Sequence, residues 1–197
     1  MAAGTAGLVR AFIAIALEPG LTVELEKIQR QFQARISRDA VRWAKPEQLH
    51  LTLKFLGHVS RHHLADLAAC LKRAPAGIAP FQLALEGAGC FPNMKNPRVV
   101  WIGINGELDS LRRLQAHVEQ LTPGFGDQKE KRPFQAHLTI GRVKAHGKQA
   151  QIVGAVLEGA SVPPLGHWTV GQFHLMQSDL SPEGARYTTL ATVALDR

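Results

Sequence analysis

The feature that most constrains the fold is an order of segments that occurs twice along the chain. The stretch "HLTLKFLG" begins at His50, and "HLTI" begins at His137, 87 residues later. A helix-periodic segment follows each histidine, and a new strand-like segment starts 31 residues after it, at Phe81 and at Trp168. A strand-like and a helix-like segment also precede each histidine. This indicates one β-α-β-α-β unit used twice, which predicts two lobes related by an approximate twofold axis.

The predicted segments alternate between strand and helix along the whole chain. They are strands at 9–17, 50–56, from 81, at 98–104, at 137–143, and from Trp168 and Tyr187, and helices at 21–37, 60–73, 108–121 and 149–157. Such a mixture excludes an all-β barrel and favours an α+β or mixed α/β class. We expect one domain, 1–197, whose two lobes derive from repeats at about 9–90 and 98–194.

Composition excludes few functions. With 197 residues and 45% hydrophobic content, the chain suits a single globular domain. The apolar stretch at 9–17 is too short to span a membrane and has no basic region before it, so we expect neither a membrane segment nor a signal peptide. Cys70 and Cys90 form no disulfide or metal-binding pattern, which favours the reducing cytosol. The net charge of +7 suits a polyanion partner but equally a basic soluble protein, and the cluster at 129–132 is a weak nucleic-acid motif.

Each motif places a histidine and a threonine on one face of a strand. Successive side chains of a strand point to opposite faces, so His50 and Thr52 share one face, while Leu51, Leu53 and Phe55 share the other. We expect the apolar face to pack against the helices. The polar face is then left to line the space between the lobes.

In the second copy, His137 and Thr139 share a face in the same way. If the two lobes are related by a twofold axis, both His/Thr pairs converge on one cleft. The alternative is that each histidine and threonine only satisfies hydrogen bonds on a half-buried sheet face. Two copies at matching places in a repeat argue against it.

Paired histidines suit acid–base chemistry at a phosphorus atom. Imidazole takes up or releases a proton near neutral pH, because its usual pKa is about 6.5. One neutral ring can activate a nucleophile while the other, protonated, donates to the leaving oxygen, and threonine hydroxyls on the same face can hold the non-bridging oxygens. The sequence offers no carboxylate cluster for a metal, so neither metal nor cofactor is expected.

The segments that carry these motifs closely resemble a known superfamily. The stretches "WAKPEQLHLTLKFLGHV", "RVVWIGI" and "RPFQAHLTIGRV" resemble the 2H phosphoesterases, and within them the RNA 2′,3′-cyclic phosphodiesterases, also called 2′-5′ RNA ligases. The resemblance runs from "RAFIAIAL" through "SDLSPEGARYTTL". It implies an α+β fold of two lobes of antiparallel sheet, with helices outside and a central cleft that carries two His-x-Thr motifs.

The resemblance also implies an activity. It is the metal-independent opening of a terminal 2′,3′-cyclic phosphate to a 2′-phosphate, on RNA ends or nucleoside 2′,3′-cyclic phosphates, with reversible 2′-5′ ligation in some members. The family's catalytic histidines map to His50 and His137, and its phosphate-binding threonines map to Thr52 and Thr139. We expect a cytoplasmic monomer.

Two positions depart from the pattern of the family. Its members usually carry Asp after the isoleucine of the first strand and Pro before the second histidine, where this chain has Ala16 and Ala136. Neither position transfers a proton, so local geometry is affected more than activity. The near symmetry of the motifs leaves the roles of the two rings open, with a slight preference for His50 as acid and His137 as base.

Other candidates are weaker. Arg142, three residues after Thr139, can neutralise a phosphate or stack on a base, and the resemblance favours this function over a solvated arginine. Lys54 alternates onto the face of His50, but a lysine at the rim is equally expected. Phe12 can line a base pocket, although a core position is favoured. His58 and His62 are four residues apart, but a helix start at Ser60 would keep them off one helical face and argues against a metal site.

Two rival functions remain open. One is a nucleotide- or RNA-binding module that keeps the fold without turnover, which the two intact motifs argue against. The other is a related enzyme of the superfamily that trims oligonucleotides or splits 2′-5′ linkages. The sequence does not separate this second enzyme from the first, because the difference in substrate lies in loops that line the cleft, such as 122–135.

Overall fold

The computed structural model describes residues 7–127, 132–181 and 184–196. It contains nine strands and four α-helices among these residues. The strands are β1 (Leu8–Ala16), β2 (Val41–Trp43), β3 (His50–Ser60), β4 (Phe81–Phe91), β5 (Val99–Gly106), β6 (His137–Val143), β7 (Gly166–Val170), β8 (Gln172–Ser181) and β9 (Gly184–Ala194). The helices are α1 (Pro19–Gln33), α2 (Leu64–Leu71), α3 (Leu108–Leu121) and α4 (Gly147–Glu158), with 3₁₀ turns at Pro46–Gln48 and Arg61–His63.

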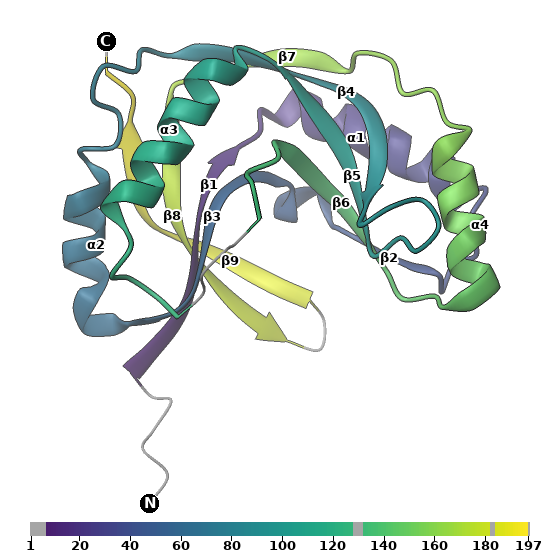
Figure 1. The fold of residues 1–197 in the computed structure, drawn as a ribbon, viewed down its shortest axis with the longest axis horizontal. Coiled ribbons are helices and arrows are strands. Elements are labelled where there is room, and N and C mark those ends of the chain that lie inside the picture. The colour runs from purple at the N-terminus through teal and green to yellow at the C-terminus, as the bar shows by residue number, and fades with distance from the viewer. Residues whose placement is uncertain (1–6, 128–131, 182–183, 197) are drawn as a thin grey trace, which may run out of the picture.

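All nine strands belong to one curled antiparallel sheet. Its order is β7-β4-β5-β6-β3-β1-β8-β9, and the short strand β2 pairs with β6. Helices α2 and α3 lie on the side of β3, β1 and β8, whereas α1 and α4 lie on the side of β6, β5 and β4 (Figure 1). The predicted α+β class, with antiparallel sheet and helices outside, is confirmed.

The two sides of the sheet have the same internal order and meet at its centre. β6 and β3 are neighbours there, β5 and β1 flank them, and β4 and β8 come next. Each side combines strands from both halves of the sequence, because β4 pairs with β5 and β8 pairs with β1. The two sides therefore do not follow the two sequence halves, and the duplication itself stays a prediction.

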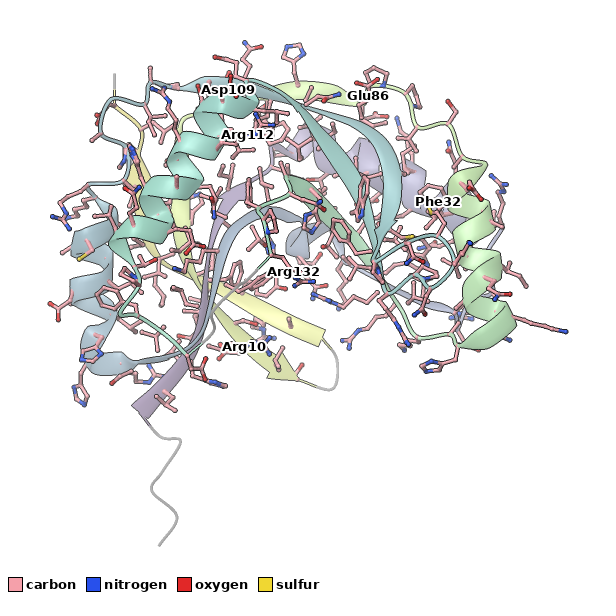
Figure 2. All side chains as sticks on the ribbon, viewed as in Figure 1. Arg10, Phe32, Glu86, Asp109, Arg112 and Arg132 are labelled. Carbon is pink, nitrogen blue, oxygen red and sulfur yellow. The ribbon has the colours of Figure 1, made fainter. Side chains whose placement is uncertain are left out.

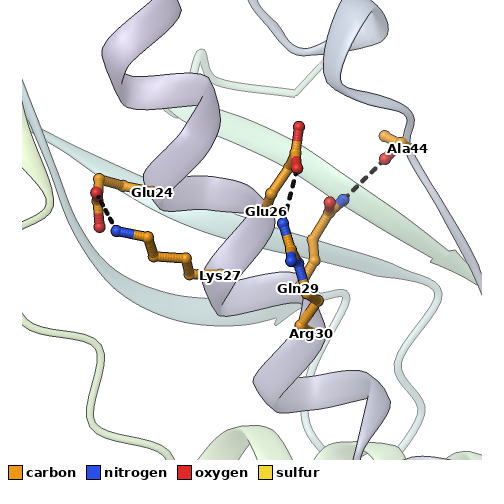
Figure 3. Close-up of polar contacts among 6 residues, drawn as sticks. All are labelled: Glu24, Glu26, Lys27, Gln29, Arg30 and Ala44. Carbon is orange, nitrogen blue, oxygen red and sulfur yellow. Dashed lines mark hydrogen bonds and ion pairs between the residues drawn. The ribbon is translucent and has the colours of Figure 1, made fainter.

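A buried glutamine fixes α1 to the centre of the sheet. The Gln29 side chain is 5% exposed, and its Nε2 donates to the carbonyls of Ala44 and Ile140, each at 2.9 Å. Figure 3 shows the bond to Ala44 on one face of α1, with two ion pairs between charged side chains of the same helix. Since Ile140 belongs to β6, the bond from Gln29 connects α1 to the strand that begins with the second motif.

The structure differs from the predicted helices and strands in three local details. Val23 lies near the helical spacing of the apolar residues in the first predicted helix, but it is 51% exposed. The predicted helix from Ser60 begins as a 3₁₀ turn, and the Ser60 side chain makes no capping hydrogen bond. Two closing strands were predicted where three exist, because β7 pairs with β4 and β8 pairs with β1 on the other side of the sheet. No helix in the described ranges is long and apolar enough to cross a membrane.

Candidate active site

The rings of His50 and His137 are held in the same way. Nδ1 of His50 lies 2.8 Å from the carbonyl oxygen of Gln48, and Nδ1 of His137 lies 2.7 Å from that of Gln135. A carbonyl oxygen only accepts hydrogen bonds, so Nδ1 of each ring carries the proton. Within the described part of the chain Nε2 of each ring has no hydrogen-bond partner. Each ring can therefore present Nε2 to a substrate, as a base when neutral and as an acid when protonated.

The strand register places the two motifs side by side. Leu51 of β3 pairs with Leu138 of β6, and both side chains are fully buried among the helices. In an antiparallel ladder the residues that flank this pair lie opposite each other, so His50 faces Thr139 and Thr52 faces His137, on the other side of the sheet. We call this side the inner face. The two histidines are diagonal neighbours on it, a relation that corresponds to about 7–8 Å between the two positions.

A β-bulge follows each motif. The register between β1 and β3 shifts after Thr52, and the register between β5 and β6 shifts after Thr139. An extra residue in a strand reverses the alternation of the side chains that follow. The third residue after each threonine, Phe55 in β3 and Arg142 in β6, is thereby turned toward the inner face.

The bulge in β3 overturns two predictions from simple alternation. Phe55 was expected on the helix-covered face, but it is 41% exposed and its ring lies 6.2 Å from that of Phe12. Lys54 was expected beside His50, but its Nζ lies 2.5 Å from Oε2 of Glu119 in α3, and only 9% of its side chain is exposed. Lys54 therefore belongs to the outer, helix-covered face.

The His50 ring is enclosed by two aromatic side chains. Phe12 stacks on it with ring centroids 4.7 Å apart, and Tyr187 of β9 meets it edge-on at 5.2 Å. Phe12 is 3% exposed, but it lies outside the main hydrophobic core and packs on the His50 ring, and its place in a base pocket stays a prediction. Burial lowers the pKa of His50 from 6.5 to about 4, while the hydrogen bond to Gln48 acts in the opposite direction.

The His137 ring is more open. Phe91 meets it edge-on at 4.8 Å and packs in turn on Trp101 at 5.4 Å. Burial lowers the pKa of His137, the hydrogen bond to Gln135 opposes this, and the charges of Arg142 and Arg132 lower it further. Both rings therefore favour the neutral form when no anion is bound, His50 the more strongly.

Three arginines bring positive charge to the two rings. Arg142 and Arg132 lower the pKa of His137, and Arg142 and Arg10 oppose the rise that burial causes in the pKa of Tyr187. Figure 2 shows Arg132 in the central part of the molecule, between α3 and the β8–β9 hairpin, and Arg10 beside that hairpin. The site therefore suits an anion.

The β8–β9 hairpin reaches over the inner face from the edge of the sheet. β1 pairs with residues 174–177 of β8, whereas β8 and β9 continue as a two-stranded ribbon to Ser181 and Gly184. Nε2 of Gln48 donates to the carbonyl of Ala185 at 2.6 Å, and its Oε1 accepts from the backbone of Lys45 at 3.1 Å. Gln48 thus binds the ribbon with its side chain and orients His50 with its carbonyl.

The alternative metal site is not assembled. His58 binds Asp127 through both its backbone N and its ring, with Nδ1 of the ring 2.9 Å from Oδ2. The ring of His63, the residue after His62, meets Phe125 edge-on at 6.5 Å. Nowhere in the described ranges do three or more His, Cys, Asp or Glu side chains form a group that could hold a metal ion.

Comparison with known proteins identifies the family. The 2′-5′ RNA ligase superfamily matches residues 17–182 of the chain. The chain belongs to this superfamily. The predicted family is thereby confirmed.

Relatives in the superfamily match over nearly the whole chain. An RNA 2′,3′-cyclic phosphodiesterase of Methanothermobacter thermautotrophicus is 35% identical over 192 residues, covering 95% of this chain and 99% of the relative. That of Archaeoglobus fulgidus is 35% identical over 92% of this chain and 97% of its own. The crystal structure of E. coli LigT complexed with 3′-AMP has a TM-score of 0.75 and 26% identity, over 96% of this chain and 99% of LigT.

Sequence reasoning within this superfamily found the motif residues but missed their surroundings. His50, Thr52, His137, Thr139 and Arg142 are brought to the inner face of the sheet. The missed residues provide contacts that only the fold creates: Gln48, Gln135, Phe91 and Tyr187. The one sequence feature that could have drawn attention to any of these four residues is that Tyr187 is the only tyrosine of the chain.

Proposed function

We propose that the chain is a metal-independent RNA 2′,3′-cyclic phosphodiesterase that opens a terminal 2′,3′-cyclic phosphate to a 2′-phosphate. One observation carries the proposal: two imidazoles, each with Nδ1 on a backbone carbonyl, present Nε2 on one face of two adjacent strands. Paired acid and base are what hydrolysis of a phosphodiester requires. Relatives that carry the name RNA 2′,3′-cyclic phosphodiesterase support the proposal.

The reaction is a displacement at phosphorus. Neutral Nε2 of one ring removes a proton from water as the water oxygen attacks the phosphorus. The bond from phosphorus to O3′ breaks, and Nε2–H of the other ring gives its proton to O3′. The product is a 2′-phosphate with a free 3′-hydroxyl, and the two rings have exchanged their protonation states. A 5′-hydroxyl of a second RNA in place of water gives a 2′-5′ linkage by the same steps, which accounts for reversible ligation.

Burial assigns the two roles differently from the sequence. From the sequence, His50 was slightly preferred as the acid, but the pKa of His50 is lowered to about 4, which keeps its ring neutral. His137 is the more exposed ring and the more readily protonated one. We therefore assign His50 as base and His137 as acid.

A substrate with sulfur in place of O3′ tests this assignment, because a thiolate leaves without a proton donor. His137→Ala should regain activity on that substrate, and His50→Ala should not. Rescue of His50→Ala alone would restore the assignment that the sequence favoured.

Threonine and arginine are assigned to the phosphate oxygens. Thr52 lies opposite His137 and Thr139 opposite His50, so each hydroxyl is beside the ring of the other strand. Arg142 is turned to the same face by the bulge, and its guanidinium can form two parallel bonds to phosphate. These donors can balance negative charge that develops on the non-bridging oxygens.

Incubation with a nucleoside 2′,3′-cyclic phosphate in excess EDTA tests the function. We expect a 2′-phosphate as the product, separated from the 3′-phosphate by chromatography. Binding without turnover would establish the binding-module alternative, and loss of activity in EDTA would establish a metal enzyme. A monomeric state and a cytoplasmic location stay predictions.

A further inference from the structure

Two arginines face each other across neighbouring strands beside the site. In the β2–β6 ladder Arg42 pairs directly with Arg142, and both side chains are exposed. Like charges directly opposite each other in a sheet are destabilising. No carboxylate of the described residues lies within ion-pair distance of either guanidinium. An anion bound between them would remove this repulsion.

The position of the pair relates it to the inner face. Directly opposed residues of an antiparallel ladder point to the same side, so Arg42 shares the face of Arg142. The guanidinium of Arg42 lies next to Gly184, the first residue of β9. Its Nη2 is 3.3 Å from the position that a Cβ atom on Gly184 would take, so the guanidinium is at the tip of the β8–β9 ribbon. The pair therefore extends from the neighbourhood of His137 to the tip of the ribbon.

The distance from the motifs suits a second anion. Arg42 stands opposite position 142 of β6, three residues along the strand from Thr139, which is assigned to the reacting phosphate, and three strand residues span roughly 10 Å. The terminal nucleotide of an RNA chain separates its cyclic phosphate from the phosphodiester on its 5′ side. An RNA end thus offers two anions at separate positions, whereas a mononucleoside cyclic phosphate offers one.

We propose that Arg42 and Arg142 bind the phosphodiester on the 5′ side of the terminal nucleotide, so that the enzyme prefers RNA ends to mononucleoside cyclic phosphates. The inference rests on the proposed function and names its substrate class. The inference is tested at Arg42 because Arg142 is also assigned to the reacting phosphate. Two forked guanidinium groups match the planar donor geometry that phosphate oxygens accept.

Two dinucleotides that end in the same nucleoside 2′,3′-cyclic phosphate isolate the charge of the linkage. One has a natural phosphodiester, and the other has a neutral methylphosphonate. We expect the wild type to show a kcat/KM about tenfold higher for the charged dinucleotide, in line with a charge-assisted hydrogen bond. Arg42→Gln should lose this preference, and Arg42→Lys, which keeps the charge without the fork, should lose less of it.

An exposed arginine at the end of α1 provides the control. Arg35→Gln removes one positive charge, as Arg42→Gln does, but from a residue outside the β2–β6 ladder, and it should keep the wild-type preference. The salt dependence gives a second readout: the plot of log kcat/KM for the charged dinucleotide against log salt should lose up to about 0.7 of its slope in Arg42→Gln.

Three results would overturn the inference. The wild type could show no preference for the charged dinucleotide, Arg42→Gln could keep the full wild-type preference, or Arg35→Gln could lose as much of this preference as Arg42→Gln. Each is separable from failure of the proposed function. If the wild type does not turn over the mononucleoside 2′,3′-cyclic phosphate, the function fails. If it turns over all three substrates alike, only the second phosphate site fails.

Discussion

The His50 side and the His137 side of the site share a frame but differ in their surroundings. Each ring bonds a carbonyl two residues earlier, and each threonine precedes a β-bulge. The third residue after the threonine is Phe55 on one side and Arg142 on the other. His50 is packed between aromatic rings, whereas His137 lies nearer to positive charge.

Matching backbone geometry on the two sides thus holds two rings with different environments. The backbone places two imidazoles on one face of two adjacent strands, and the side chains around each ring set how readily it is protonated. An apolar environment keeps His50 neutral, which suits a base, and the more exposed His137 can be charged, which suits an acid. The bulge on the His50 side presents Phe55, whose ring suits a nucleobase, and the bulge on the His137 side presents Arg142, which suits a phosphate.

Removing either ring is expected to have the largest effect. His50→Ala and His137→Ala should each lower kcat by about 10³-fold, since general acid–base catalysis contributes about 10²–10⁴-fold. His117→Ala is the matched control. Nδ1 of His117 also lies 2.8 Å from a backbone carbonyl oxygen, that of Ala74, but His117 belongs to α3 and not to the two central strands. Nearly full activity in a variant of His50 or His137 would show that this ring takes no part in the reaction.

The two bulge residues should differ in which kinetic constant they change. Arg142→Gln should lower kcat/KM by about 10²–10³-fold if its charge stabilises the transition state, as loss of one oxyanion donor does. Phe55→Ala should mainly raise KM, by about tenfold, if its exposed ring stacks on a base. Steady-state kinetics on a nucleoside 2′,3′-cyclic phosphate separates the two. Equal changes in kcat and KM for both variants would contradict the assigned difference.

Acidification should destabilise the fold through His50. The unfolded chain binds a proton there near pH 6.5, whereas the folded chain binds it only near pH 4. Between these values the unfolded state holds more protons, so stability is retained above pH 6.5 and lost as the pH falls toward 4. The loss is at most about 3 kcal/mol from this group.

Denaturant unfolding at pH 7 and pH 4.5 measures this loss. His50→Gln cannot take up the proton and should lose less stability than the wild type over the same interval. His137 and His174, whose pKa values burial also lowers, contribute in the same direction in both proteins. An identical pH dependence in His50→Gln would show that His50 is not buried as described.

The smallest effect concerns the ribbon. Gln48→Ala removes the bond to Ala185, worth about 1 kcal/mol, and should lower kcat several-fold. The backbone amides of 184–187 should then exchange with solvent faster, by hydrogen-exchange measurement. Gln135→Ala should have a smaller effect, because its side chain is exposed and only its carbonyl orients His137. Equal effects would mean that the ribbon does not distinguish the two sides.

Sequence alone predicted what depends on local order along the chain. The strand period and the repeated triplet placed His50, Thr52, His137 and Thr139 correctly, because residues two apart in a strand share a face. The helix at 108–121 was found to the residue, since its apolar positions follow a clear period.

The remainder depends on contacts between distant segments. Alternation misplaced Lys54 and Phe55 because a bulge is set by pairing with β1, which no single strand encodes. The exchange of β4 and β8 between the two sides of the sheet leaves no local trace either. Tyr187 reaches His50 only because the ribbon folds back from the edge of the sheet.

We propose that His50 and His137 contact the same phosphate. The ¹⁵N resonances of Nε2 in both rings, assigned from His50→Gln and His137→Gln, can be followed while a nucleoside 2′-phosphate is titrated. We expect both resonances to shift at the same ligand concentration and the pKa of both rings to rise beside the bound anion. A shift confined to one ring would contradict this proposal.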